Sequence, residues 1–236
     1  MKISVCMATY NGEKYIKEQL ESILCQLGEN DEVIISDDGS TDNTKSIIES
    51  FKDKRIKFFT NNGVKGVVSN FENSLNKSSG DYIFLADQDD VWLSNKVTTC
   101  LNRLKDFDLI VCNCKVVDGS LNVLHQSYFN LARSGRGFFK NIYRSTYLGC
   151  CLAFRRDILT DILPFPKKLM MFHDWWIGFI AELKLNVYFE NEPLMLYRRH
   201  INTTSNTVGS SSNSLFFKIY SRVQIFVLGV FRVFIR

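Results

Sequence analysis

Three carboxylates stand close together in residues 87–90, where the sequence reads DQDD after an apolar run. Asp87 and Asp89 lie at positions i and i+2, so at a turn after a strand both side chains can converge on one cation. Such oxygen ligands suit Mg²⁺ or Mn²⁺, and Mg²⁺ commonly binds one or two carboxylates together with substrate phosphates. A solvated acidic turn that caps the next helix would explain the same residues without a metal.

A second acidic pair, Asp37 and Asp38, follows the apolar run 32–36. A carboxylate here can accept hydrogen bonds from the N–H groups of a base or from ribose hydroxyls, although a turn that caps the next helix would use the same residue types. The turn after the first apolar run, residues 8–15 (ATYNGEKY), lacks the G-x-G-x-x-G spacing of dinucleotide-binding folds. A nucleotide bound here is therefore not held as NAD is held.

Both motifs come directly after predicted strands, in a half of the chain that alternates apolar runs with helical periodicity. Strands are predicted at 3–8, 32–36, 55–59, 82–86 and 109–117, and helices at 13–27, 42–51, 67–76 and 97–105. This alternation indicates an α/β fold with a mostly parallel sheet, whose ligands bind at the carboxyl ends of the strands. We interpret that edge as a site, because four polar loops meet there: 9–12, 37–40, 61–63 and 87–90.

The alternation loosens after about residue 118. The further elements predicted are a hairpin partner at 121–125, a strand at 149–155, a helix at 171–185 and closing strands at 187–189 and 194–199. Residues 128–147 are aromatic and basic, and residues 202–214 have the low apolar content of a linker.

Composition excludes several classes of protein. With 236 residues, 45% of them apolar and 23% charged, the chain can bury a large core and is unlike a disordered protein. No run of ~18 uncharged apolar residues could span a bilayer as a helix, and residues 1–8 lack the features of a signal peptide. The seven cysteines form no CxxC pair and no zinc-site spacing, so we expect buried thiols in a reducing cytosol.

The net charge of +4 comes from the C-terminal end. Residues 215–236 contain four basic side chains and no acid, so the other 214 residues carry 25 of each sign. A nucleic-acid-binding protein would usually carry a basic stripe on its folded body, so we expect no nucleic-acid partner. On a helix, Lys218, Arg222, Arg232 and Arg236 fall within a wedge of roughly 80° and nearly everything else is apolar. This pattern predicts an amphipathic helix at an anionic membrane surface, or else a helix packed on the core or on a second protomer.

Three motifs taken together resemble the family 2 inverting glycosyltransferases of the GT-A fold: 8–12 (ATYNG), 36–42 (SDDGSTD) and 80–92 (GDYIFLADQDDVW). The similarity is close from residue 1 to about 105 and looser to about 205. Within the family, the DQDDVW form, residues 149–156 (GCCLAFRR) and residues 197–200 (YRRH) are similar to bacterial rhamnosyl-, galactosyl- and related transferases. Those enzymes build O-antigen or capsular polysaccharide.

The resemblance implies roles for individual residues. The nucleotide-sugar donor would contact Thr9, Tyr10, Asn11, Asp38, Asp87 and Arg199, with Asp38 on the base and Asp87 near the ribose or diphosphate. Asp89 would be the main ligand of Mn²⁺ or Mg²⁺, and His200 would reach the metal or the diphosphate. Arg198 is an alternative to Arg199, because a guanidinium binds phosphate in bidentate fashion.

The family's catalytic base is an acid in a late helix, and the resemblance places it at Asp174. Inversion requires a carboxylate that takes the proton of the acceptor hydroxyl as its oxygen attacks the anomeric carbon. Asp174 is the sole acid between Asp161 and Glu182, although an acid at a helix N-terminus also complements the helix dipole. The indole rings of Trp175 and Trp176, which follow, could form the floor of a binding site for the acceptor sugar or fill the core.

Two rival interpretations remain. Residues 87–91 fit the D-x-D-x-[TV] motif of haloacid-dehalogenase phosphatases, but there the motif ends the first strand and here it ends the fourth. A non-catalytic nucleotide-sugar-binding subunit of a polysaccharide assembly complex would bind the donor without sugar transfer. Intact Asp89 and Asp174 argue against it, since such a subunit would be free to lose either residue.

The expected protein is a metal-dependent glycosyltransferase that moves a sugar from a UDP- or dTDP-linked donor to a hydroxyl of a lipid-linked oligosaccharide. A GT-A domain would occupy residues 1–205, with a nucleotide-sugar-binding half (1–117) and an acceptor half that carries the base (118–205). A linker (206–214) would lead to the membrane-associating helix (215–236). We expect a cytoplasmic protein attached peripherally to the inner face of a bacterial plasma membrane.

Overall fold

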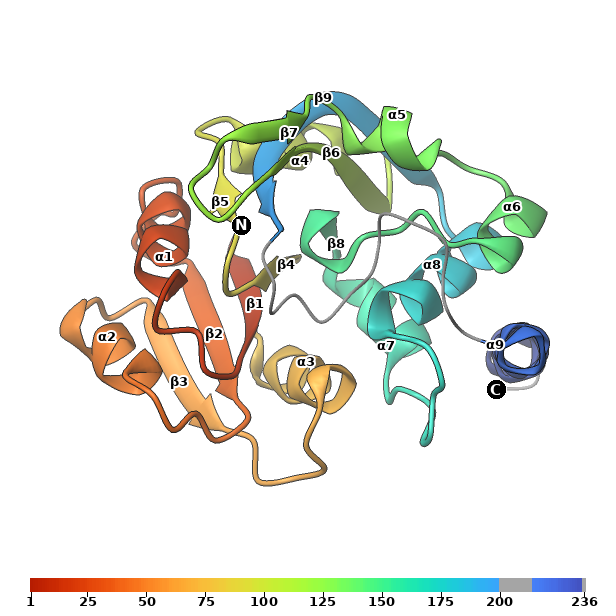
Figure 1. The fold of residues 1–236 in the computed structure, drawn as a ribbon, viewed down its shortest axis with the longest axis horizontal. Helices are drawn as coiled ribbons and strands as arrows, with labels where there is room; N and C mark the ends of the chain where they lie inside the picture. The colour runs from red at the N-terminus through yellow and green to blue at the C-terminus, as the bar shows by residue number, and fades with distance from the viewer. Residues whose placement is uncertain (200–213, 235–236) are drawn as a thin grey trace.

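The strands of the first half form the parallel part of a nine-stranded sheet (Figure 1). The computed structural model describes residues 1–199 and 214–234. The strands of this part lie in the order β3 (Ile56–Thr60), β2 (Glu32–Asp37), β1 (Ile3–Thr9) and β4 (Tyr82–Asp87), and the helices between them are α1 (Ile16–Leu24), α2 (Thr44–Ser50) and α3 (Val67–Lys77). All of these elements were predicted from the sequence, with boundaries shifted by a few residues.

The register of the parallel strands aligns their carboxyl ends. Ala8 of β1 lies opposite Ser36 of β2 on one side and opposite Asp87 of β4 on the other. The loops after these three strands therefore start at the same level of the sheet. This alignment brings the polar motifs together.

The chain after β4 extends the sheet with antiparallel and parallel pairs. Its strands are β5 (Val91–Trp92), β6 (Leu109–Val117), β7 (Val123–His125), β8 (Leu152–Arg155) and β9 (Val187–Arg198). β8 pairs antiparallel with β4 and with β6, which joins the two halves, and β7 is the hairpin partner predicted for β6. The helices are α4 (Lys96–Arg103), α5 (Tyr128–Ala132), α6 (Phe138–Tyr143), α7 (Leu159–Ile162), α8 (His173–Lys184) and α9 (Leu215–Phe234), with 3-10 turns η1 (Gly149–Cys151) and η2 (Arg156–Ile158).

The two predicted closing strands are one irregular strand, β9. Its pairing with β6 shifts where Cys112 lies opposite Glu190 but the next residue, Asn113, lies opposite Pro193. Pro193 has no N–H group to donate, and residues of this kind are tolerated in sheets at bulges. The side chain of Asn113 donates to the carbonyl of Asn191 at 2.8 Å and so satisfies one backbone group that the bulge leaves unpaired.

The predicted strand at 149–155 begins instead with the turn η1. The ammonium group of Lys96, which is fully buried, donates to the carbonyl of Cys150 at 2.8 Å and lies 4.3 Å from the ring centroid of Trp92. This contact takes a carbonyl that a longer strand would have paired with its neighbour. Six of the cysteines are buried, as expected, whereas Cys25 is exposed; all seven are free thiols.

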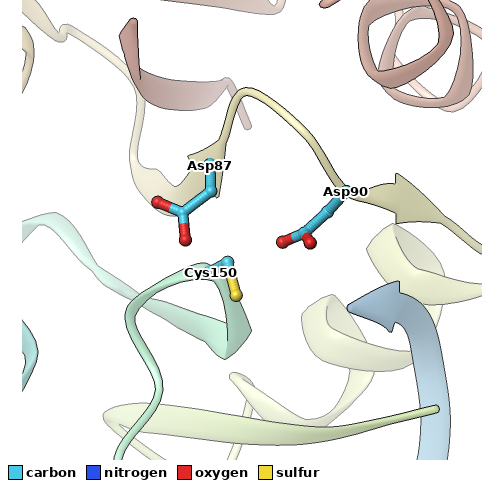
Figure 2. Close-up of side chains that lie close together, drawn as sticks. All are labelled: Asp87, Asp90 and Cys150. Carbon is cyan, nitrogen blue, oxygen red and sulfur yellow. The ribbon is translucent and has the colours of Figure 1, made fainter. Parts of the chain in front are cut away.

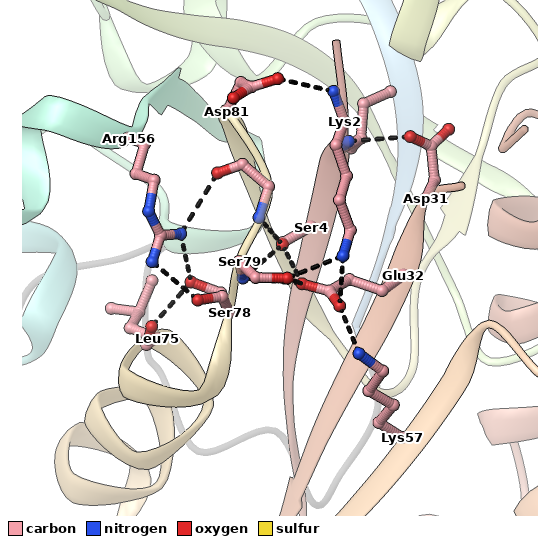
Figure 3. A network of polar contacts seen from close by, with 12 residues as sticks. Lys2, Ser4, Asp31, Glu32, Lys57, Leu75, Ser78, Ser79, Asp81 and Arg156 are labelled. Carbon is pink, nitrogen blue, oxygen red and sulfur yellow. Dashed lines mark hydrogen bonds and ion pairs between the residues drawn. The ribbon is translucent and has the colours of Figure 1, made fainter.

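The edge of the sheet opposite the polar loops is tied by buried charge (Figure 3). Glu32 is buried at the start of β2 and pairs with Lys57 at 2.7 Å and Lys2 at 3.1 Å. Its carboxylate also accepts hydrogen bonds from Ser4 and from the backbone and hydroxyl of Ser79. The network joins β1, β2, β3 and the residues before β4 at one point.

Helix α9 is present as predicted, but two arginines of its basic stripe, Arg222 and Arg232, face the body of the protein. Arg222 donates to the carbonyl of Tyr143, and Arg232 donates to the carbonyls of Leu163 and Pro164. Tyr143 is the last residue of α6, and Leu163 and Pro164 directly follow α7. The carbonyls at the end of a helix have no partner within the helix, and the helix dipole favours cations there. The expectation that these two arginines face lipid is therefore wrong.

The other face of α9 is apolar and exposed. The buried residues of the helix as a whole are Ser221, Ile225 and Gly229. Gly229 packs so closely on Phe179 of α8 that a Cβ there would lie 2.1 Å from the ring. The exposed apolar side chains of the helix are Leu215, Phe216, Ile219, Tyr220, Val223, Phe226, Val227, Phe231 and Phe234. Among the residues that the structure describes, no helix has the length and hydropathy needed to cross a membrane.

Candidate functional site

A cavity of about 1170 Å³ opens at the carboxyl edge of the parallel strands. Its wall combines the loops after β1, β2 and β4 with η1 and the start of α8, so both halves of the chain contribute. Seven of the residues predicted for the site line it: Thr9, Tyr10, Asn11, Asp38, Asp87, Asp89 and Asp174. Three of the four predicted polar loops thus meet at one cavity, together with the predicted base from a distant helix.

Asp38 is held in place by the loop between β3 and α3. One carboxylate oxygen accepts from the amide of Asn61 at 2.7 Å, and the other accepts from the backbone N–H of Gly66 at 2.7 Å. The fixed carboxylate borders the cavity. Asn61, which lies in the predicted polar loop 61–63 but was given no role of its own, thus orients Asp38 together with Gly66.

The hydroxyl of Thr9 does not face the cavity as a free group. It donates to the carboxylate of Asp37 at 2.9 Å, and Thr9 is almost fully buried. Asp37 also accepts from the backbone N–H groups of Gly39 and Ser40, so it organises the turn after β2. Asn11 similarly uses its side-chain oxygen to cap the backbone of Thr41 at 2.9 Å. Both residues shape the wall, and Tyr10, 56% exposed, presents a free ring to the cavity.

A residue missed from the sequence, Gln88, ties the loop after β4 to the loop after β1. Its amide oxygen accepts from the backbone N–H of Tyr10 at 2.9 Å, and its amide nitrogen donates to the carbonyl of Tyr10 at 3.0 Å. Gly12 makes room for this contact, because a Cβ at that position would lie 2.3 Å from the Gln88 oxygen. The middle residue of the DQD motif therefore sets the distance between the two loops.

The carboxylates after β4 lie in a desolvated position. Burial, followed by the charges of Asp89 and Asp174, raises the pKa of Asp87 to about 7. Burial also raises the pKa of Asp90 well above its usual value, with Asp89 and Asp87 adding to the effect. Figure 2 shows Asp87 and Asp90 at the two ends of the loop between β4 and β5, with Cys150 of η1 facing them.

Asp174 lies in the first turn of α8. One carboxylate oxygen accepts from the backbone N–H of Trp175 at 2.8 Å. Burial raises the pKa of Asp174 to about 6, against hydrogen bonds from the N–H groups of Trp175 and Gly149. Such a pKa suits a general base near neutral pH.

The residues beside Asp174 fill the core. Trp175 donates its indole N–H to the carbonyl of Asn141, and Trp176 donates to the carbonyl of Ile162. Both rings are buried, so of the two interpretations open from the sequence the core packing holds. His173 stacks on Phe71 at a centroid distance of 4.1 Å, and burial lowers its pKa to about 3.

Of the two arginines at the end of β9, Arg198 borders the cavity and Arg199 is not part of the lining. The Arg198 guanidinium is almost fully buried and donates to the carbonyls of Asp89 and Gly119 and to the carboxylate of Glu18. These contacts hold the DQDD loop against α1, which leaves Arg198 a structural role. His200 lies outside the described residues.

The charge of the cavity fits a cation. Asp38, Asp87, Asp89 and Asp174 line it, and the exposed cations among the lining residues are Lys14 and Lys65, of which Lys65 donates to the carbonyl of Asn61. An anionic diphosphate would be repelled from four carboxylates unless a cation lay between them. Carboxylate oxygens are the donor type that Mg²⁺ and Mn²⁺ prefer, so the residues present fit either ion.

Comparison with known proteins gives one family and a set of named relatives. Residues 4–163 match the model of glycosyl transferase family 2. The chain is 30% identical to a dTDP-rhamnosyl transferase of Shigella flexneri (87% of this chain, 74% of that protein). It is 28% identical to a GalNAc(5)-diNAcBac-PP-undecaprenol beta-1,3-glucosyltransferase of Campylobacter jejuni (93% and 71%). The chain spans about two thirds of the length of the curated relatives it matches.

Solved structures match the fold. S. aureus TarS in complex with UDP-GlcNAc superimposes with a TM-score of 0.75 at 21% identity, over 98% of this chain and 67% of TarS. The mannosyltransferase PcManGT from Pyrobaculum calidifontis, solved with GDP-Man and Mn²⁺, gives a TM-score of 0.63 at 19% identity, over 82% of this chain and 56% of that one. The mixed α/β sheet described above is shared with these proteins.

Proposed function

Because this chain belongs to glycosyl transferase family 2, we propose that it transfers a sugar, with inversion, from a UDP- or dTDP-linked donor to a hydroxyl of a lipid-linked oligosaccharide. The observation that carries the proposal is that Asp174 shares one cavity with Asp38 and Asp89, which come from different loops. The relatives named as a dTDP-rhamnosyl transferase and an undecaprenol-linked glucosyltransferase support the two substrate classes.

The roles proposed for the described residues follow from their positions, and the role proposed for His200 follows from the family resemblance alone. Asp38, whose two carboxylate oxygens are fixed by hydrogen bonds, would also accept hydrogen bonds from the base, and Tyr10 would contact the nucleoside. Asp174 would take the proton from the acceptor hydroxyl as that oxygen attacks the anomeric carbon. Asp89 and His200 would hold Mn²⁺ or Mg²⁺, which supplies stabilisation of the charge developing on the departing diphosphate. Arg199 and Asp87 stay proposed donor contacts.

A panel of UDP-, dTDP- and GDP-sugars tests the function. Each donor is combined with Mn²⁺ or Mg²⁺ and an undecaprenyl-diphosphate-linked acceptor, and release of nucleoside diphosphate is measured together with thermal stabilisation of the protein. We expect acceptor-dependent release with one UDP- or dTDP-sugar and its loss with EDTA or in Asp89→Asn. Donor binding without transfer would instead support a non-catalytic binding subunit.

We further propose that the exposed face of α9 lies in an anionic membrane surface, with cations supplied by its neighbour α6. Phe138 of α6 packs against Phe226 of α9 at 6.5 Å between ring centroids. Phe139 and Tyr143 are strongly exposed on the same short helix, and Lys140 and Arg144 are exposed beside them. Apolar side chains flanked by cations are the composition that binds such interfaces, and they would hold the protein at the inner face of the plasma membrane.

Flotation with liposomes tests this placement. We expect the wild type to float with vesicles containing phosphatidylglycerol, and the double variant Phe216→Ser/Phe231→Ser to bind them at least about fivefold less. Leu124→Ser, which removes an apolar side chain on β7 that is about as exposed as Phe231 (54% against 57%), is the control and should float normally. Equal flotation of all three proteins, or self-association through α9 without lipid, would contradict the proposal.

A further inference from the structure

The buried thiol of Cys150 lies close to the carboxylates of Asp87, which is partly buried and lines the cavity, and Asp90, which is fully buried. One ligand atom each of Asp87, Asp90 and Cys150 lies within 4.8 Å of the other two. The two carboxylates come from opposite ends of the loop between β4 and β5, and Cys150 comes from η1 across from them (Figure 2). These residues belong to segments about 60 positions apart in the sequence, so their convergence is a property of the fold.

One oxygen of this cluster lacks a partner. Asp90 is fully buried, and its Oδ1 accepts from the backbone N–H of Arg198 at 2.9 Å. Its Oδ2 is also buried and accepts from no N–H or O–H group within the described part of the chain, and the remaining polar neighbour of the carboxylate is the Cys150 thiol. A buried carboxylate oxygen without a partner is costly, and a bound cation would remove that cost.

We propose that Asp87, Asp90 and Cys150 form a binding site for one thiophilic divalent cation of the Zn²⁺ or Cd²⁺ class. Thiolate and carboxylate are both ligands of Zn²⁺, which binds three or four such groups, whereas Mg²⁺ and Mn²⁺ favour oxygen alone. The site is separate from the cation assigned above to Asp89. Asp87 lines the cavity, whereas Asp90 and Cys150 lie behind it, so an ion reaches the site past Asp87.

The site has a consequence for sugar transfer, and this consequence alone rests on the proposed function. An ion bound to Asp87 from behind would withdraw that carboxylate from the donor. Zn²⁺ or Cd²⁺ would then inhibit transfer in the presence of saturating Mg²⁺. Binding of the ion itself does not depend on any activity.

Titration of the EDTA-treated, desalted full chain with Cd²⁺ tests the site. Binding is followed by calorimetry and by the ultraviolet charge-transfer absorption of a cadmium–thiolate bond. We expect one equivalent to bind with this absorption. Cys150→Ser should lose the absorption and bind at least about tenfold more weakly, the minimum expected when even an outer-shell partner of a metal is removed.

Matched variants separate this site from other thiols and from the donor site. Cys151→Ser, beside the cluster, and Cys25→Ser, the exposed cysteine, should keep the absorption. Asp90→Asn, which keeps the oxygen that accepts from Arg198, should weaken Cd²⁺ binding, and melting curves check that it folds. Asp89→Asn should bind Cd²⁺ normally, even if all transfer assays fail. Unchanged absorption in Cys150→Ser, or none in the wild type, would overturn the proposal.

Discussion

At the scale of single residues, the environment of Asp174 decides what the cavity can do. The carboxylate is desolvated, is fixed by backbone N–H groups and shares its cavity with the carboxylates that follow β4. Replacing it by asparagine keeps the shape and removes the ability to accept a proton. We expect Asp174→Asn to lower turnover by a factor of about 10²–10⁴ and to leave donor affinity nearly unchanged.

The measurement for this variant is steady-state turnover combined with calorimetric titration of the donor. Trp176→Phe, a change in the core of the same helix, controls for general damage to α8. Turnover of Asp174→Asn within threefold of the wild type would exclude the residue as the base.

The pKa of Asp174 predicts the pH dependence. Burial raises it to about 6 from the ordinary value of 3.8, so the protonated, inactive form gains population below pH 6. We expect kcat/KM to fall about tenfold per pH unit below that point. A profile flat down to pH 4.5, measured where the fold is intact by circular dichroism, would mean that the base is an ordinary exposed carboxylate or another group.

The sequence predicts which residues line the cavity more reliably than it predicts the contacts of their side chains. Thr9 and Asn11 follow β1 as predicted, yet their side chains bind the neighbouring loop instead of pointing to free space. Gln88 and Asn61 carry no signal of their own, because an amide becomes important only through the partner that the fold supplies. Arg198 was similarly indistinguishable from Arg199 until the position of Glu18 was known.

At the scale of elements, the α/β alternation was predictable because each strand and helix has a local periodicity. The face of α9 that packs on the domain could not be predicted from the sequence. Helical spacing of the arginines shows only that their charges lie on one side of the helix. What that side contacts depends on the carbonyls that end α6 and α7, which are some 60–80 positions away. The bulge in β9 could not be predicted for a related reason, because its residues have the sequence pattern of two strands with a turn between them.

Gly229 tests how tightly α9 is docked. In an exposed helix a change from glycine to alanine stabilises by up to about 1 kcal/mol. Here the new methyl group would meet Phe179, whose ring is buried between Phe138 and Phe226. We therefore expect Gly229→Ala to lower the free energy of unfolding by about 1–3 kcal/mol, as overpacked sites do.

Urea denaturation measures this change, and Val227→Ala on the exposed face is the control. The double variant Gly229→Ala/Phe179→Leu should recover part of the loss, because leucine vacates the space of the ring. Stabilisation by Gly229→Ala would show that α9 does not pack on α8 as described.

At the scale of the whole molecule, the network around Glu32 holds the end of the sheet opposite the cavity. Burial alone would raise the pKa of Glu32, but Lys57, Ser4 and Ser79 outweigh it and hold the pKa well below its usual value. A folded-state pKa below the unfolded one stabilises the fold above the unfolded value of about 4.5. This contribution is lost as the pH falls below 4.5.

Glu32→Gln should therefore lower the free energy of unfolding at pH 7 by about 2–4 kcal/mol, toward the low end for a buried pair because Lys2 and Lys57 are partly exposed. The same variant should depend less on pH between 4.5 and 3 than the wild type does. Glu49→Gln, in an exposed pair with Lys45, should change stability by less than about 0.5 kcal/mol. Parallel pH profiles of wild type and Glu32→Gln would contradict the assignment.

The inward arginines of α9 also decide how the molecule responds to ionic strength. Both guanidinium groups donate to neutral carbonyl oxygens and lie near an indole ring, and Arg232 also interacts with the charge of Glu72. Hydrogen bonds to neutral carbonyls are screened by dissolved ions less than exposed ion pairs are. The attraction that we propose between Lys140, Arg144 and acidic lipid headgroups would instead be an exposed ionic interaction, which weakens at high ionic strength. Concentrated salt should accordingly detach the protein from a vesicle while its last helix remains seated on the domain.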